Sequence, residues 1–318
     1  MNTDLETIIK TLKIGNNEIE FCVLTESEYT SIYYDQMKKV GWKPIADAMK
    51  AHYILAKNSI FALKYKDTII ATLSAAKSPV FGVAYMGFFI LDKEWASLGL
   101  GKYLWTKTAN LLEQEGYVIE FDSPVELLSY YSSLGYKVFT TATMYMLAEH
   151  SRIDYSAINA NIQEISPGNI ADVIEYDKSL INNSNRETYL SAWFNKKHTI
   201  AVCYISNGNI MGYGVMSKHI SRESNSDTYS YVLAPIYAKN PEVAAEIINA
   251  LCSRANVNEP IYLDTLNFNP MAAAIVESLG FKAVMPINRM SASGTLGEKR
   301  EAIISQVYAL SSHGYSPL

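Results

Sequence analysis

A pair of closely spaced glycines marks the segment of this sequence that is best suited to bind an anion. A predicted strand at 83–91 is followed by Leu98, Gly99, Leu100, Gly101 and Lys102, and then by apolar residues at helical spacing through residue 112. Glycines let backbone N–H groups approach a ligand, and the first turn of a helix adds unpaired N–H donors and a partial positive charge. A pyrophosphate is the most natural occupant, while a tight turn without a ligand would fit a lone Gly-x-Gly equally well.

A dinucleotide site of the Rossmann type is a second reading of the same loop. Glu120 and Asp122 lie roughly 20 residues downstream, where such sites carry an acidic residue for the ribose. Two features disfavour this reading. Leu104 stands at the third glycine position, and the loop before Gly99 is too long for the tight turn that follows a Rossmann first strand.

An internal repeat indicates the domains that must position these residues. The sequence Ser-Leu-Gly-Tyr-Lys at 133–137 recurs as Ser-Leu-Gly-Phe-Lys at 278–282. Each copy ends a predicted helix, places glycine where a left-handed C-cap is expected, and leads into a strand-like run. Similar elements flank both copies in the same order. We therefore predict two copies of one α+β domain, at 1–148 and 162–318, joined by a polar linker at 149–161.

Local patterns predict the elements around the glycine loop and in the second copy. Helices are expected at 26–37 and 45–55. The second copy carries a hairpin around Asn207-Gly208, which is a strong turn signal. A last strand is expected at 306–310, with no indication of where it docks.

Composition excludes several classes of protein. The chain has 318 residues, of which 49% are hydrophobic, and a net charge of −5, so it is neither disordered nor suited to bind nucleic acid through its backbone. No apolar run approaches the ~18 residues that span a membrane. The first residues lack a secretory pattern and the three cysteines lie far apart, so a cytoplasmic protein is expected. The five histidines show no metal-binding spacing, and we predict no metal.

The glycine loop and a later tyrosine motif resemble the GNAT N-acetyltransferase superfamily. Residues 91–95, Leu-Asp-Lys-Glu-Trp, are similar to the strand end of that family, and 96–101 are similar to its acetyl-CoA loop. Tyr130 to Tyr136 resembles the later Tyr-x-x-x-Gly-Phe signature. The segment Gly41-Trp42-Lys43-Pro44 is similar to sequences of a bacterial branch of this superfamily, whose members carry a second GNAT-like domain. The resemblance implies two tandem domains, each a mixed, mostly antiparallel sheet flanked by helices.

The resemblance also implies an activity and a set of site residues. The activity is acetyl transfer from acetyl-CoA to a primary amine of a small molecule or peptide. Phe89 and Leu91 would present backbone N–H groups to the thioester and pantetheine, and residues 98–102 would bind the pyrophosphate. Tyr131 would protonate the leaving thiolate, since a phenol is a suitable donor at neutral pH. Asp122 is the preferred base, with Glu120 and His52 as alternatives.

The sequence departs from the family pattern in both copies. Ala96 replaces the usual Arg or Gln of the loop, which removes a cation near the phosphates. In the second copy no Gly-x-Gly occurs, and Asn240, Pro241 and Glu242 start the corresponding helix. Val276 stands at the position of Tyr131 and cannot donate a proton. We therefore expect the second copy to be a structural partner that forms one side of the substrate cleft, rather than a second active site.

Two other functions stay open at this point. The loss of the loop Arg at Ala96 is compatible with a non-catalytic acyl-CoA-binding or sensor protein. A nucleotide-dependent oxidoreductase is the remaining alternative, and Leu104 argues against it.

Overall fold

The computed structural model describes residues 10–14, 17–148, 159–181, 186–219 and 229–311. The first half contains seven strands and four α-helices in these residues. In chain order they are β1 (Lys10–Ile14), β2 (Asn17–Val23), α1 (Glu26–Lys39), α2 (Met49–Leu55), β3 (Ile60–Tyr65), β4 (Thr68–Ser78), β5 (Val83–Leu91), α3 (Leu100–Gln114), β6 (Val118–Ser123), α4 (Leu128–Ser133) and β7 (Lys137–Leu147).

The described part of the second half repeats this order from β2 onward and then adds a short helix and a strand. It contains β8 (Ile162–Glu164), α5 (Ile170–Leu180), α6 (Arg186–Phe194), β9 (Thr199–Ser206), β10 (Asn209–His219), β11 (Ser230–Ala238), α7 (Pro241–Cys252), β12 (Ile261–Leu266), α8 (Pro270–Ser278), β13 (Lys282–Ser291), α9 (Glu298–Glu301) and β14 (Val307–Ala309). Residues 149–158 of the expected linker lie outside the described residues. The division at 148 and 162 therefore stays a prediction.

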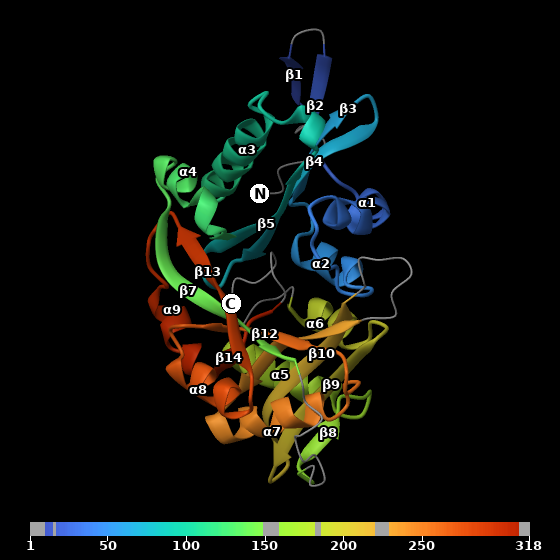
Figure 1. The fold of residues 1–318 in the computed structure, drawn as a ribbon, viewed down its shortest axis with the longest axis vertical. Coiled ribbons are helices and arrows are strands. Elements are labelled where there is room, and N and C mark those ends of the chain that lie inside the picture. The colour runs from blue at the N-terminus through green and yellow to red at the C-terminus, as the bar shows by residue number, and fades with distance from the viewer. Residues whose placement is uncertain (1–9, 15–16, 149–158, 182–185, 220–228, 312–318) are drawn as a thin grey trace.

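The two halves share one continuous sheet, because each contributes a strand to the other (Figure 1). The strand order is β1-β2-β3-β4-β5-β6-β13-β7-β12-β11-β10-β9-β8. Strand β13 of the second half pairs with β6 and β7, and β7 of the first half pairs with β12 and β13. The predicted fold class of two mostly antiparallel α+β units is confirmed. The exchange of β7 and β13 was not foreseen.

Helices cover both faces of the sheet in each half. In the first half α3 and α4 pack on one face, and α1 and α2 pack on the other. In the second half α7 and α8 cover one face, and α5 and α6 the other. One core cluster joins the halves, because Ala51 of α2 and its N-cap residue Ala48 lie in the same cluster as Tyr189 and Trp193 of α6. The chain thus folds around an extensive interface between its halves.

Most predicted local elements are found, with one correction. Thr25 forms a capping box with Glu28 at the start of α1. Asn207 and Gly208 both have positive φ, as a two-residue hairpin turn requires. The second predicted helix was wrong at its start, since α2 begins only at Met49. Ile45 forms a β-bridge to His219 instead, which holds the segment before α2 against the second half.

Candidate active site

A fork between β5 and β6 forms the centre of the candidate site. The two strands pair in parallel only from Val83 opposite Val118 to Tyr85 opposite Glu120, although both continue further. A bulge turns β5 away, because Phe88 has a φ of +50° and the register with β4 shifts nearby. Beyond Tyr85, the side of β5 that faces β6 therefore has no pairing to β6. Its backbone groups can bind a ligand that lies between the strands.

The first turn of α3 packs directly on the arm of β5 that lines this fork. A Cβ atom on Gly101 would lie 3.4 Å from Cζ of Phe89 and 3.5 Å from Cδ2 of Leu91. These are ordinary van der Waals distances, so the backbone of the first turn of α3 lies directly against the side chains of this arm of β5. The structure brings together Phe89, Leu91 and Gly101, which the sequence assigned to one binding site.

The loop before α3 leaves the start of this helix uncapped by any side chain. Gly99 is the N-cap residue, with a φ of +78° that favours glycine, and the space beyond it is open to 4 Å. Leu98 and Lys102 are exposed. Leu100 is fully buried in the core, so only its backbone can face a ligand. The N–H groups of the first turn, the helix dipole and the Lys102 ammonium together favour an anion here.

Tyr131 lies on α4 beside the other arm of the fork. Its ring centroid is 4.5 Å from that of Phe121 on β6 and 4.7 Å from that of Trp105 on α3. Its side chain is largely buried, and this burial raises the pKa of the phenol. The hydroxyl therefore stays protonated at neutral pH, which a proton donor requires.

Both carboxylates of β6 are paired with arginines from the second half. Asp122 accepts a hydrogen bond from Nε of Arg289 at 3.1 Å, and the Arg289 guanidinium also lies over the ring of Tyr85. Glu120 is fully buried and forms a two-pronged ion pair with Arg300. Asp122 is partly exposed, whereas Glu120 is held on both oxygens. Of the two, only Asp122 keeps a surface that a substrate or water could reach.

His52 occupies a structural environment rather than the fork. It is buried in α2 between the rings of Tyr33 and Trp193, with centroid distances of 5.8 and 5.6 Å. Burial and the nearby Lys196 lower the pKa of His52 to about 3. Tyr33 in turn stacks on Phe88 at 5.7 Å, so His52 is separated from the bulge of β5 by a ring.

The second half contains an equivalent fork, but a strand of the chain itself fills it. Strands β11 and β12 pair in parallel only at Tyr231 and Val232. Beyond this point β14 pairs with β11, and the N–H of Leu310 donates to the carbonyl of Asp264 on β12 at 2.9 Å. Asn269 also donates to the carbonyl of Val307. The C-terminal strand thus takes the place that a ligand would occupy in the first fork.

The start of α7 also differs from the start of α3 as the sequence predicted. The Asn240 side chain accepts a hydrogen bond from the N–H of Val243, and Pro241 is the first helical residue. Val276 is buried, and its carbonyl accepts from Phe281 as the carbonyl of Tyr131 accepts from Tyr136. The two positions are therefore equivalent, and only the first carries a hydroxyl.

Sequence reasoning missed three residues beside the fork. Tyr85, Arg289 and Arg300 carried no local signal, because their neighbours come from strand exchange between the halves. Among the described residues, no group of three His, Cys, Asp or Glu side chains could hold a metal. No helix in this part of the chain is long and apolar enough to cross a membrane.

Two family models match the chain, one in each half. Residues 23–136 match the model described as "Acetyltransferase (GNAT) family", and residues 173–308 match "Acetyltransferase (GNAT) domain". The chain therefore belongs to the GNAT acetyltransferases. More particularly, it carries two such domains in tandem.

Solved structures share this fold at low sequence identity. A structure described as an acetyltransferase from Pyrococcus horikoshii superposes with a TM-score of 0.69 at 14% identity, over 95% of this chain and 97% of that one. A tandem GNAT protein of the clavulanic acid biosynthesis pathway superposes with a TM-score of 0.60 at 13% identity, over 86% of this chain and 98% of that one. N-myristoyltransferase from Saccharomyces cerevisiae with bound myristoyl-CoA superposes with a TM-score of 0.62 at 10% identity, over 89% of this chain and 80% of that one. A search of curated proteins finds no significant match.

Proposed function

We propose that this chain is an acetyl-CoA-dependent N-acetyltransferase with one working site, in its first half. The observation that carries the proposal is the open fork of β5 and β6 next to the uncapped start of α3. A fork with unpaired backbone groups suits the extended pantetheine chain, and a glycine-capped helix start suits a pyrophosphate. The myristoyl-CoA bound to the yeast structure supports an acyl-CoA in this kind of fold.

The reaction has three requirements, and the first fork offers a group for each. The amine attacks the thioester carbonyl, and backbone N–H groups around Phe89 and Leu91 stabilise the negative charge on its oxygen. The C–S bond then breaks, and the hydroxyl of Tyr131 gives its proton to the leaving thiolate. Asp122 takes a proton from the attacking amine, directly or through water. Its pairing with Arg289 fixes the position of the carboxylate.

The second half serves as a structural partner in this proposal. β14 fills its fork, Pro241 removes one N–H from the start of α7, and Asn240 binds another. Glu242 adds a negative charge where a phosphate would lie. These features support a single acyl-CoA per chain, placed in the first half.

A cytoplasmic location is part of the proposal. Cys22, Cys203 and Cys252 are all buried as free thiols. Three unpaired thiols are compatible with a reducing compartment.

A panel of primary amines, incubated with acetyl-CoA, tests the activity by release of free CoA thiol. We expect at least one amine to stimulate thiol release well above the rate of hydrolysis, with formation of the acetylated amine. If the chain binds acetyl-CoA but acetylates no amine of the panel, the result would favour the acyl-CoA sensor.

A further inference from the structure

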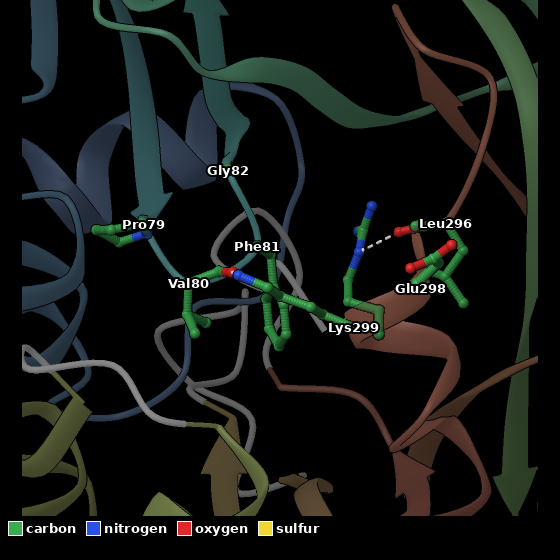
Figure 2. A pocket seen from close by; sticks show the side chains of 9 residues that line it. Pro79, Val80, Phe81, Gly82, Leu296, Glu298 and Lys299 are labelled. Atoms are coloured by element: carbon green, nitrogen blue, oxygen red, sulfur yellow. Dashed lines mark hydrogen bonds between the residues drawn. The ribbon is translucent and has the colours of Figure 1, made fainter.

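The turn that joins β4 to β5 is fixed at the closed end of the fork. The carbonyl of Val80 accepts a hydrogen bond from Lys299 at 3.1 Å, and the carbonyl of Gly82 accepts one from the N–H of Val118 at 2.8 Å. Figure 2 shows this turn opposite residues 296–300 of the second half, across a pocket of about 410 Å³. Both strands therefore start from an anchored turn, and β5 changes direction only further along.

β5 turns away from β6 at a bulge. On β4, Ser74 pairs with Gly87. Two residues earlier on β4, Thr72 pairs with Ile90, which lies three residues further along β5. One residue of β4 therefore faces two residues of β5, 88–89, as in a β-bulge. A bulge interrupts the regular alternation of backbone groups, so the partners of its carbonyls show which way its N–H groups point.

Two buried hydroxyl groups of β4 bind the carbonyls of this bulge. The Ser74 hydroxyl donates to the carbonyl of Gly87 at 3.0 Å. The Thr72 hydroxyl donates to the carbonyl of Phe88 at 3.2 Å. Both hydroxyl-bearing side chains are fully buried. Because the carbonyl and the N–H of a trans peptide point in opposite directions, the N–H groups of Phe88 and Phe89 face away from β4, into the fork.

The regular part of β5 beyond the bulge gives the same direction. The N–H of Asp92 donates to the carbonyl of Ile70 on β4 at 2.9 Å. Since the N–H groups of a strand alternate between its two sides, those of Leu91 and Phe89 face the fork. The bulge adds the N–H of Phe88 directly beside that of Phe89. Two adjacent N–H groups on one side of a chain form a site for an oxygen that carries negative charge.

The second half has the same bulge without these groups. The pairing of β10 with β11 has the same register shift, between Gly214 and Met216. These two residues occupy the positions of the two hydroxyl-bearing residues of β4, and neither carries a hydroxyl. Pro235 stands one residue before the partner of Gly214, which is the position of Phe89 in β5. Proline has no N–H group, so the second half lacks both hydroxyls and one of the two N–H donors.

We propose that Thr72 and Ser74 are positioning residues, whose hydroxyls hold the two N–H groups of the bulge as a pair toward the thioester oxygen. This inference rests on the proposed function. The amine nitrogen bonds to the thioester carbon, and an electron pair of the C=O bond moves to the oxygen. The paired N–H groups stabilise that charge until the C–S bond breaks and the CoA thiolate leaves. The hydroxyls themselves contact only the two peptide carbonyls.

The pair of N–H groups can be tested by binding alone. Ethyl-CoA, in which a methylene replaces the thioester carbonyl, accepts no hydrogen bond at that position. By calorimetry, the parent should bind acetyl-CoA about threefold to tenfold more tightly than ethyl-CoA. Thr72→Val keeps the shape of the side chain without its hydroxyl and should reduce this preference to less than about twofold. Thr72→Ser keeps the hydroxyl and should preserve it. Ser74→Ala gives the same test if Thr72→Val does not fold.

Turnover gives a second readout. With an amine that the parent acetylates, Thr72→Val should lower kcat about tenfold to 100-fold and leave the KM of the amine unchanged, because the N–H pair acts on the thioester oxygen. Thr72→Ser should keep kcat within about threefold of the parent. Thr108→Val is the matched control, at a buried threonine of α3 whose hydroxyl has no hydrogen-bond partner among the described residues. It should leave kcat unchanged.

These measurements separate the positioning role from the proposed activity. An unchanged preference for acetyl-CoA in both Thr72→Val and Ser74→Ala, or equal affinities of the parent for the two ligands, would overturn the positioning role. A preference that depends on the hydroxyls, without acetylation of any amine, would keep the N–H pair as a carbonyl-binding site and refute the transferase. Acetylation with an unchanged kcat in both variants would keep the transferase and refute the positioning role.

Discussion

Glu120 and Arg300 are 180 residues apart in the sequence and meet in a buried, two-pronged ion pair with distances of 2.6 and 2.5 Å. Both side chains are almost completely excluded from solvent. The pair ties the strand that forms one arm of the fork to the second half of the chain. Two residues further on, Asp122 pairs with Arg289 of β13, which makes a second link between β6 and the second half. The geometry of the first site therefore depends on residues of the second domain.

Loss of Arg300 should destabilise the fold strongly. Arg300→Met leaves the Glu120 carboxylate buried without its partner, and breaking one side of a buried pair costs about 3–5 kcal/mol. Adding Glu120→Leu should recover much of this loss, because both charges are then gone. Urea denaturation of the parent, the Arg300→Met variant and the double variant gives the three free energies of unfolding. A single substitution that costs less than about 1 kcal/mol would show that water already solvates this pair.

Removal of the Tyr131 hydroxyl should slow acetyl transfer without weakening cofactor binding. Tyr131→Phe keeps the ring contacts to Trp105 and Phe121. If the hydroxyl protonates the thiolate, kcat should fall by about 10²–10⁴-fold, the usual contribution of a general acid. Affinity for acetyl-CoA, measured by calorimetry, should stay the same. A kcat within about twofold of the parent would make Tyr131 a packing residue only.

A negative charge in the first turn of α3 should weaken acetyl-CoA binding. Lys102→Glu removes an exposed cation and opposes the helix dipole, which we expect to cost about 1–2 kcal/mol, or about tenfold in Kd. Thr106→Glu, exposed one turn further along the same helix, is the matched control and should change Kd by less than about threefold. Equal effects of both substitutions would indicate a general charge effect rather than a phosphate site.

The stability of the chain should rise with pH above neutrality because of one buried lysine. Burial lowers the pKa of Lys196 to about 7, while its amine donates to the hydroxyls of Thr199 and Ser217. Between pH 7 and about 10 the unfolded chain holds this proton and the folded chain does not, so stability increases as pH rises. Between pH 7 and 8.5 the increase should be up to about 1.4 kcal/mol per pH unit.

Lys196→Met isolates this contribution, because other titrating groups affect parent and variant alike. The free energy of unfolding of the parent, minus that of the variant, should rise over the same pH range. A difference that stays constant from pH 7 to 8.5 would mean that Lys196 is protonated in the folded chain.

The structural features around the candidate site in the first half could be predicted from the sequence where they are local. The glycines at 99 and 101, the helix that follows and the tyrosine before Gly135 all lie within 40 residues. Turn and cap chemistry at Asn207, Gly208 and Asn240 was equally local, and the structure confirms it. These features depend on backbone conformation and helix ends, which short segments determine.

The long-range features were not readable from the sequence. Nothing in the residues of β7 and β13 distinguishes a strand that stays in its own domain from one that pairs with the other domain. The arginine partners of Glu120 and Asp122 follow from that exchange, since both lie on or just after β13. Likewise, nothing in residues 306–310 indicates that β14 docks beside β11. The late start of α2 has a similar origin, because pairing of Ile45 with His219 competes with helix formation.

The central claim is that the chain binds one acetyl-CoA, at the fork of the first half. Calorimetric titration of acetyl-CoA into the intact chain tests it most directly, with Lys102→Glu as the variant for the first site and Glu242→Gln for the corresponding helix of the second half. We predict one bound molecule per chain, a Kd raised about tenfold by Lys102→Glu, and no change with Glu242→Gln. Two bound molecules per chain, or none, or a Kd that responds to Glu242 and not to Lys102, would contradict this account.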